Sequence, residues 1–162
     1  KNLRQFKIMI EHNLNLIGAA LKADLNQPEP TPHLTDCLGE VEYMLANLST
    51  LMTPKSLTSE VSLVNFPATA KLVPEPLGTV LVVGTWNFPF HAALGPVPGA
   101  LAAGNRVVVK PGSLSQNSSR LIAQLIDEYM DPRHVICVQG GIEVMTPLLN
   151  DFVWEHIFFT GS

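Results

Sequence analysis

The first part of the chain is patterned as helix. Apolar side chains recur every three or four positions, the spacing that places them on one helix face. A first stripe predicts one long helix from residue 3 to about 25, which the proline-rich segment 27–32 ends, and a second predicts a helix from 34 to about 52. The stripes comprise Leu3, Phe6, Ile10, Leu14, Ile17 and Leu21, and then Leu34, Leu38, Val41, Leu45, Leu48 and Leu51.

The pattern changes at Gly78, after which runs of β-branched and aliphatic residues alternate with helical segments. This alternation predicts the α/β fold class, with two N-terminal scaffold helices followed by a doubly wound parallel sheet. We expect strands at 79–83, 106–110, 134–138 and 156–159, and helices at 92–103, 116–129 and 143–150.

The segment 57–76 is rich in Ser, Thr, Val and Pro, and we expect it to be extended, with a short strand at 70–73. The chain is therefore expected to form one incomplete domain over residues 1–162. Its parts are a helical scaffold (1–56), an extended connection (57–76) and a βαβαβαβ core (77–162).

The ends of the expected strands carry the candidate site residues. Right-handed crossovers bring the carboxyl ends of parallel strands to one edge of the sheet, where open α/β folds bind their ligands. Asn87, Lys110, Gly140 and Gly161 follow the four strands in turn, so we expect them to converge at that edge.

Asn87 stands between Trp86 and Phe88, just after the strand that ends before Gly84. A neutral amide donates two hydrogen bonds without titrating, which suits the stabilisation of an oxyanion. The flanking aromatic rings can restrict its rotamers. Asn is also a common turn residue, so a simple turn is the alternative interpretation.

Lys110 offers a compact cation on a long stem, which suits a ribose hydroxyl or a phosphate of a dinucleotide. The alternative is a solvated lysine paired with a nearby carboxylate. Gly140 and Gly141 either let the backbone approach a ligand closely or form a plain turn from strand to helix.

Composition excludes several classes of function. The formal net charge is -4, and the chain has no clusters of Lys and Arg, so nothing indicates nucleic-acid or anionic-membrane binding. No apolar run is long enough to span a bilayer, and targeting information is either absent or lies outside this piece. The chain has few cysteines, which suggests a reducing compartment, and we expect a cytoplasmic location. No histidine pair has metal-ligand spacing, and we expect no metal site.

Four motifs in order resemble those of the aldehyde dehydrogenase superfamily, and most of all its class 3 branch for fatty and aromatic aldehydes. The likeness extends upstream to 63–68 and 74–78, so it covers nearly the whole chain. The motifs are Gly-Thr-Trp-Asn-Phe-Pro-Phe (84–90), Gly-Ala-Leu-Ala-Ala-Gly-Asn (99–105), Val-Val-Lys-Pro-Gly-Ser (108–113) and Phe-Phe-Thr-Gly-Ser (158–162).

The resemblance implies a cofactor, NAD or NADP, along this edge. It makes Lys110 a contact of the adenosine ribose, and it places the pyrophosphate at the helix that follows Gly161. Where many NAD-using members carry Glu, this chain has Ser113, which loosens the preference for NAD and admits NADP. The implied cofactor-binding residues are Gly84, Thr85, Trp86, Asn87, Lys110, Ser113, Gly140, Gly141, Phe159, Gly161 and Ser162.

The resemblance also implies the reaction, NAD(P)-dependent oxidation of an aldehyde to a carboxylic acid in a full-length enzyme, which in class 3 relatives is usually a homodimer. A cysteine thiolate attacks the aldehyde, Asn87 donates to the resulting oxyanion, and a glutamate-activated water releases the acid. The family's cysteine and glutamate motifs lie downstream of this chain, in a catalytic domain that we expect to be absent here. Neither Cys37 nor Cys137 is expected to take the nucleophile's role.

Two other functions stay open at this point. The chain could be a catalytically inactive truncated product that acts as an interaction module with full-length subunits. A different Rossmann-type oxidoreductase is the weaker alternative, because no Gly-x-Gly-x-x-Gly fingerprint occurs.

Overall fold

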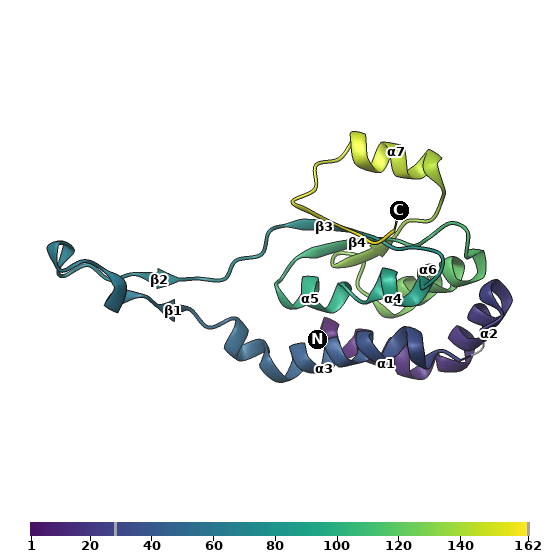
Figure 1. The fold of residues 1–162 in the computed structure, drawn as a ribbon, viewed down its shortest axis with the longest axis horizontal. Coiled ribbons are helices and arrows are strands. Elements are labelled where there is room, and N and C mark those ends of the chain that lie inside the picture. Colours follow the sequence, from purple (N-terminus) through teal and green to yellow (C-terminus); the bar gives the residue numbers. More distant parts are fainter. Residues whose placement is uncertain (28, 162) are drawn as a thin grey trace.

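The computed structural model describes residues 1–27 and 29–161. Helical segments from the first part of the chain form its outer layer, and a parallel sheet of four strands, with further helices on both faces, lies beside them (Figure 1). The outer helices are α1 (Asn2–His12), α2 (Leu14–Leu25) and α3 (Thr31–Leu51).

All strands of the main sheet are parallel, and their order is β5-β4-β3-β6. This arrangement confirms the predicted fold class, a scaffold of helices followed by a doubly wound parallel sheet. The strands are β3 (Thr79–Val83), β4 (Arg106–Lys110), β5 (Val135–Cys137) and β6 (His156–Phe159).

Strand residues alternate between two apolar clusters, one on each face of the sheet. On one face, Val80, Val82, Val107 and Val109 join a large core formed with the helices. On the other face, Leu81, Val83 and Val108 pack against partly buried side chains that include Met145 and Trp154. Strands β3 and β4 are therefore apolar on both sides, as is typical of parallel strands covered on both faces.

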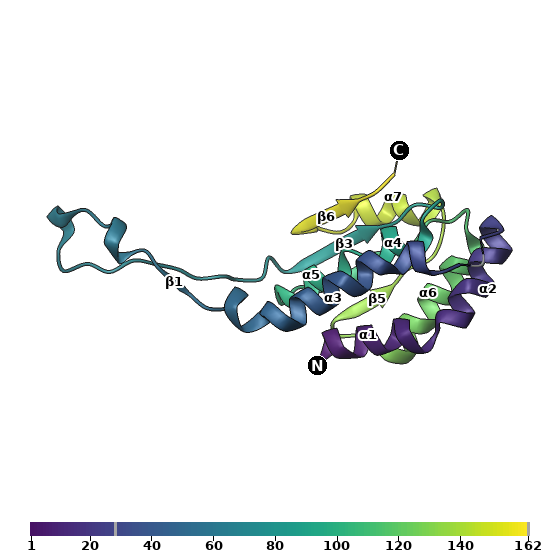
Figure 2. The same ribbon diagram turned by 60° about the horizontal axis from the view of Figure 1, so that its bottom comes forward.

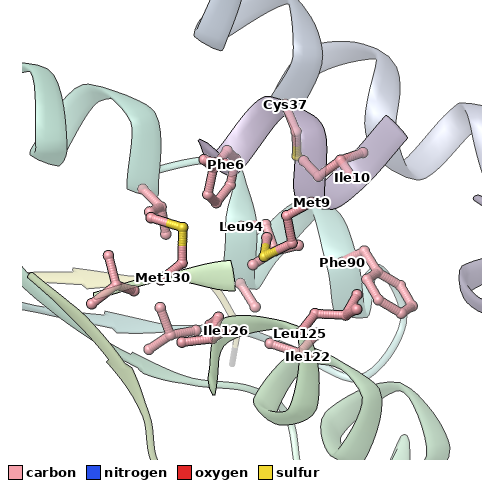
Figure 3. Close-up of a cluster of buried hydrophobic side chains, with 14 of the residues drawn as sticks. Phe6, Met9, Ile10, Cys37, Phe90, Leu94, Ile122, Leu125, Ile126 and Met130 are labelled. Carbon is pink, nitrogen blue, oxygen red and sulfur yellow. The ribbon is translucent and has the colours of Figure 1, made fainter. Parts of the chain in front are cut away.

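The large core is made by helices from both halves of the chain (Figure 3). Phe6, Met9 and Ile10 of α1 meet Leu94 of α4 (Pro89–Leu94) and three apolar residues of α6 (Gln116–Tyr129), namely Ile122, Leu125 and Ile126. Each such side chain contributes about 1.5–3 kcal/mol when fully buried. This packing holds the outer helices against the sheet domain.

A carboxylate also connects the outer layer to the core. Asp24, near the end of α2, accepts hydrogen bonds from the backbone N–H groups of Asn117 (3.1 Å) and Ser118 (2.7 Å) in the first turn of α6. Burial opposes the ionisation of Asp24, but these hydrogen bonds outweigh it and lower the pKa of the carboxyl. The N-terminus of α6 is thus capped by a side chain from another helix.

The prediction of one long first helix was wrong, because the chain leaves helical geometry at Asn13 (φ -117°, ψ 18°). The buried Asn13 side chain turns back and donates to the carbonyl of Met9 at 2.8 Å. The helix expected at 92–103 is also divided, into α4 and α5 (Val97–Ala102), at Gly95-Pro96. The remaining helix, α7 (Ile142–Asn150), covers the opposite face of the sheet (Figure 1).

The connection between α3 and the sheet projects from the body as an arm (Figures 1 and 2). Its two short strands, β1 (Lys55–Ser56) and β2 (Lys71–Leu72), pair antiparallel, and two 3-10 turns, η1 (Thr58–Glu60) and η2 (Leu63–Asn65), lie beyond them. Val64 and Phe66 in this arm are 92% and 83% exposed. The extended segment expected here is present, although its strand is shorter than 70–73.

Candidate functional site

The carboxyl ends of the strands lie level along one edge of the sheet. Val83 of β3 is in register with Lys110 of β4 and with Phe159 of β6. The N–H of Gly84 donates to the carbonyl of Lys110 at 2.9 Å, so the ladder continues one residue past β3. The loops that carry the candidate residues therefore start side by side.

The loop after β3 presents Asn87 to solvent. The Thr85 hydroxyl donates to Oδ1 of Asn87 at 3.0 Å, and both aromatic neighbours, Trp86 (51%) and Phe88 (46%), are partly exposed. The Ser115 hydroxyl, which is buried, donates to the Trp86 carbonyl at 2.5 Å. The loop is thus fixed by side-chain hydrogen bonds while its amide stays accessible.

A histidine from the scaffold packs beneath this loop. The ring of His33, in α3, lies 5.2 Å from the ring of Phe88 and is 1% exposed. Burial lowers the pKa of His33, and the neighbouring His91 lowers it further, so the ring is neutral near pH 7. The sequence pattern assigned His33 only to the scaffold, since a contact between such distant positions leaves no local signal.

Lys110 is not the solvated lysine of the alternative interpretation. Its side chain is 6% exposed, and its ammonium donates to the carbonyl of Pro111 at 3.1 Å. Burial lowers the pKa of Lys110, and the charge of Glu143 and the thiol of Cys137 oppose that shift. A buried cation with a single hydrogen bond to a carbonyl has donor capacity left for a ligand.

Three of the predicted cofactor residues line one pocket of about 310 Å³ beyond β4 and β5. Its walls carry hydroxyl, amide and backbone groups, and the one cationic side chain among them is Arg120 of α6. No sequence motif singled out Arg120, which comes to the pocket through the orientation of α6. The lining residues are Ser113, Gln116, Ser119, Arg120, Gln139, Gly140 and Gly141.

Gly140 and Gly141 form a tight turn into α7. Gly140 has φ +142°, and a Cβ there would overlap the side chain of Val144. The N–H of Gly141 donates to Glu143 Oε1 at 2.7 Å, and this hydrogen bond lowers the pKa of Glu143. The turn interpretation is therefore sound, and the same turn forms one wall of the pocket.

The end of β6 completes the edge. Phe159 is 59% exposed, and Gly161 adopts φ +144°, a conformation that L side chains rarely adopt. Ser162, also predicted to bind the cofactor, lies outside the described residues.

A larger pocket, of about 620 Å³, lies between α3, the helices α4 and α5, and strands β3 and β6. None of the predicted site residues lines it. His91 and Asp36, whose side chains approach to 3.8 Å, lie in its wall.

The two cysteines are unsuited to nucleophilic catalysis. Cys37 is fully buried and Cys137 half-buried, and burial raises the pKa of each thiol to about 12. Such thiols are protonated at neutral pH and unreactive. Within 1–27 and 29–161, no group of three or more His, Cys, Asp or Glu side chains is arranged to hold a metal ion.

The sequence profile described as the aldehyde dehydrogenase family matches residues 3–162. The chain belongs to this family. It is 41% identical to aldehyde dehydrogenase family 3 member I1, chloroplastic, from Arabidopsis thaliana, over 99% of the chain and 29% of that relative. It is 37% identical to the dimeric NADP-preferring aldehyde dehydrogenase of Canis lupus familiaris, over 96% of the chain and 34% of that relative.

The fold is shared with solved structures of the family. The Staphylococcus aureus AldH structure, in a substrate-bound state, superimposes with a TM-score of 0.91 at 30% identity. The match covers 99% of this chain and 35% of that one. The chain thus spans about a third of the length of the aldehyde dehydrogenases it matches.

Proposed function

We propose that this chain supplies the NAD(P)-binding wall and the oxyanion donor of an aldehyde dehydrogenase that oxidises aldehydes to carboxylic acids. Family membership supports the reaction class. The observation that carries the proposal is the exposed Asn87 amide at the carboxyl end of β3, with its Oδ1 engaged by Thr85. The nucleophilic cysteine and the general-base glutamate would come from a catalytic domain beyond this chain.

The reaction requires of Asn87 only that its amide be correctly positioned. Attack of a thiolate on an aldehyde converts the carbonyl oxygen into an alkoxide. The Asn87 NH₂ group would donate to that oxygen, and a fixed neutral donor stabilises the charge without a proton transfer. A bound NAD or NADP would accept the hydride that leaves the substrate carbon.

The pocket beyond β4 and β5 fits the adenosine ribose of such a cofactor. Hydroxyl and amide groups suit sugar hydroxyls, and Lys110 lies at the end of the neighbouring strand. Ser113 adds no negative charge, and Arg120 adds a positive one. We propose that this combination tolerates the 2′-phosphate of NADP as well as the free ribose of NAD, consistent with the dog relative's description as NADP-preferring.

The partners and location are proposals as well. The relative from dog is described as dimeric, and the projecting arm exposes apolar side chains that a second subunit could cover, so we propose a homodimer of the full-length protein. Among the described residues, no helix has both the length and the apolar character needed to cross a membrane. Cytoplasmic location stays a prediction, and the Arabidopsis relative is named chloroplastic.

The decisive experiment is Asn87→Ala in the full-length enzyme. We expect turnover to fall by about two to three orders of magnitude, the usual effect of losing an oxyanion donor, with a smaller change in cofactor affinity. Asn47→Ala is the matched control, because Asn47 lies on α3 and donates only to the Tyr43 carbonyl of its own helix. Normal turnover in Asn87→Ala would show that Asn87 is a turn residue and not an oxyanion donor.

A second proposal is supported by β6. All of its residues are exposed, and in the described sheet it pairs on one side only, with β3. An open strand edge can recruit another chain, so the isolated chain could act as an inactive module that binds full-length subunits. Co-expression with a tagged full-length subunit tests this, and the absence of a mixed complex would exclude it.

A further inference from the structure

The hydrogen bond between Thr85 and Asn87 defines which end of the amide faces outward. Thr85 Oγ1 donates to Asn87 Oδ1 at 3.0 Å, within a loop where Asn87 is exposed and Thr85 half-buried. A hydroxyl that donates to the carbonyl end leaves the NH₂ end turned away from Thr85. The two N–H donors are then available to a ligand.

This orientation matters because an exposed Asn amide is otherwise poorly constrained. Rotation about χ2 of Asn is broad, so the donor and acceptor ends can exchange places. An oxyanion that met the carbonyl end would face a second lone pair and be repelled. A donor must be fixed before the charge develops in order to stabilise it.

Thr85 is itself well placed to hold the amide. Its β-branched side chain has few χ1 rotamers. Its backbone follows Gly84, whose N–H is bonded to the Lys110 carbonyl of the neighbouring strand. The hydroxyl is therefore carried by a residue directly next to the hydrogen-bonded end of the β3 ladder.

We propose that Thr85 is a positioning residue, which holds the Asn87 amide with its NH₂ group toward the substrate oxygen. This inference rests on the oxyanion role of Asn87 proposed above. It predicts that the Thr85 hydroxyl contributes to turnover only through Asn87.

The test compares Thr85→Val and Thr85→Ser in the full-length enzyme. Val keeps the shape and removes the hydroxyl, and we expect kcat to fall about three- to tenfold, with unchanged KM for the aldehyde. Ser restores the hydroxyl and should keep kcat within about twofold of the parent. Thr85→Ala is measured in parallel in case the valine variant does not fold. Thr53→Val is the control, because Thr53 is exposed and its hydroxyl donates to the Ser49 carbonyl at the end of α3.

A double-mutant cycle separates positioning from a structural role. In an Asn87→Ala background, removal of the Thr85 hydroxyl should change kcat by less than about twofold. An equal loss in both backgrounds would overturn the inference. So would full activity of Thr85→Val and Thr85→Ala while Asn87→Ala is impaired, which leaves the proposed function standing. If Asn87→Ala itself were fully active, the proposed function would fail and this inference with it.

Discussion

Gly112 lies directly against the backbone of Thr85. A Cβ at Gly112 would come within 2.7 Å of the Thr85 carbonyl carbon and 2.8 Å of the Trp86 nitrogen. The loop after β4 thus supports the loop that carries Asn87, backbone against backbone, with no space for a side chain between them.

Gly112→Ala should therefore displace the Asn87 loop. We expect a loss of about 1–3 kcal/mol in the free energy of unfolding, as for other overpacked sites, together with reduced turnover of the full-length enzyme. Gly39→Ala is the matched control, because a Cβ there meets nothing within 4 Å and Gly39 lies inside α3. That control should gain about 0.5–1 kcal/mol. Urea unfolding of both variants measures the difference, and equal effects would show that the contact is not tight.

Removal of the Asp24 carboxylate should weaken the attachment of α6. Asp24→Ala is expected to cost about 1 kcal/mol, as for other N-terminal caps. Asp127→Ala, at an exposed position near the other end of α6, should cost less. Hydrogen exchange at Asn117 and Ser118 reports the cap directly, and unchanged exchange in Asp24→Ala would refute it.

The same carboxylate gives stability a defined pH dependence. The pKa of Asp24 is lower in the folded chain than in the unfolded chain, so its contribution is complete above the unfolded pKa. The contribution is lost as the pH falls through the folded pKa. The difference in stability between parent and Asp24→Ala should therefore shrink on acidification, and a constant difference would contradict this assignment.

Lys110→Met separates stability from cofactor binding. Met removes a buried ammonium and keeps the apolar stem, so stability should be unchanged or higher. If Lys110 binds the ribose, cofactor affinity should fall about tenfold or more, the value of a charged hydrogen bond. Titration calorimetry measures this, with the exposed Lys22→Met as control. Full affinity in Lys110→Met would make this lysine purely structural.

Ser113→Glu should move the cofactor preference toward NAD. The new carboxylate can accept hydrogen bonds from the ribose hydroxyls and repels a 2′-phosphate. Ser113→Gln adds similar bulk without the charge and should change the ratio of NAD to NADP affinity much less. An unchanged ratio in Ser113→Glu would show that position 113 does not contact the ribose.

The sheet could be predicted from the sequence because its central strands, β3 and β4, are covered on both faces. Runs such as Val107-Val108-Val109 are typical of such strands, and the expected bounds 79–83, 106–110 and 156–159 match the structure. The strand expected at 134–138 is shorter, Val135–Cys137. The breaks at Asn13 and at Gly95-Pro96 were missed because the apolar spacing continues through them. The spacing of apolar residues indicates which helix face is buried, but it does not indicate whether the helix backbone is continuous.

The sheet edge that carries the candidate site could also be located from the sequence, because the predicted strand bounds give the positions where the strands end. The contact of His33 with Phe88 and the place of Arg120 in the pocket could not be predicted from the sequence, because they depend on how separate helices pack. Asn87, Lys110 and Ser113 were found through motifs, and their roles stay predictions until the variants are measured.

Through the Asp24 cap on α6, the pocket beyond β4 and β5 depends on α2, a helix that does not line it. Gln116, Ser119 and Arg120 enter the pocket from the first turns of α6, next to the N–H groups that Asp24 binds from α2. Acid that protonates Asp24 would weaken the hydrogen bonds that hold these turns. The outer helices thus give the pocket an acid-sensitive support.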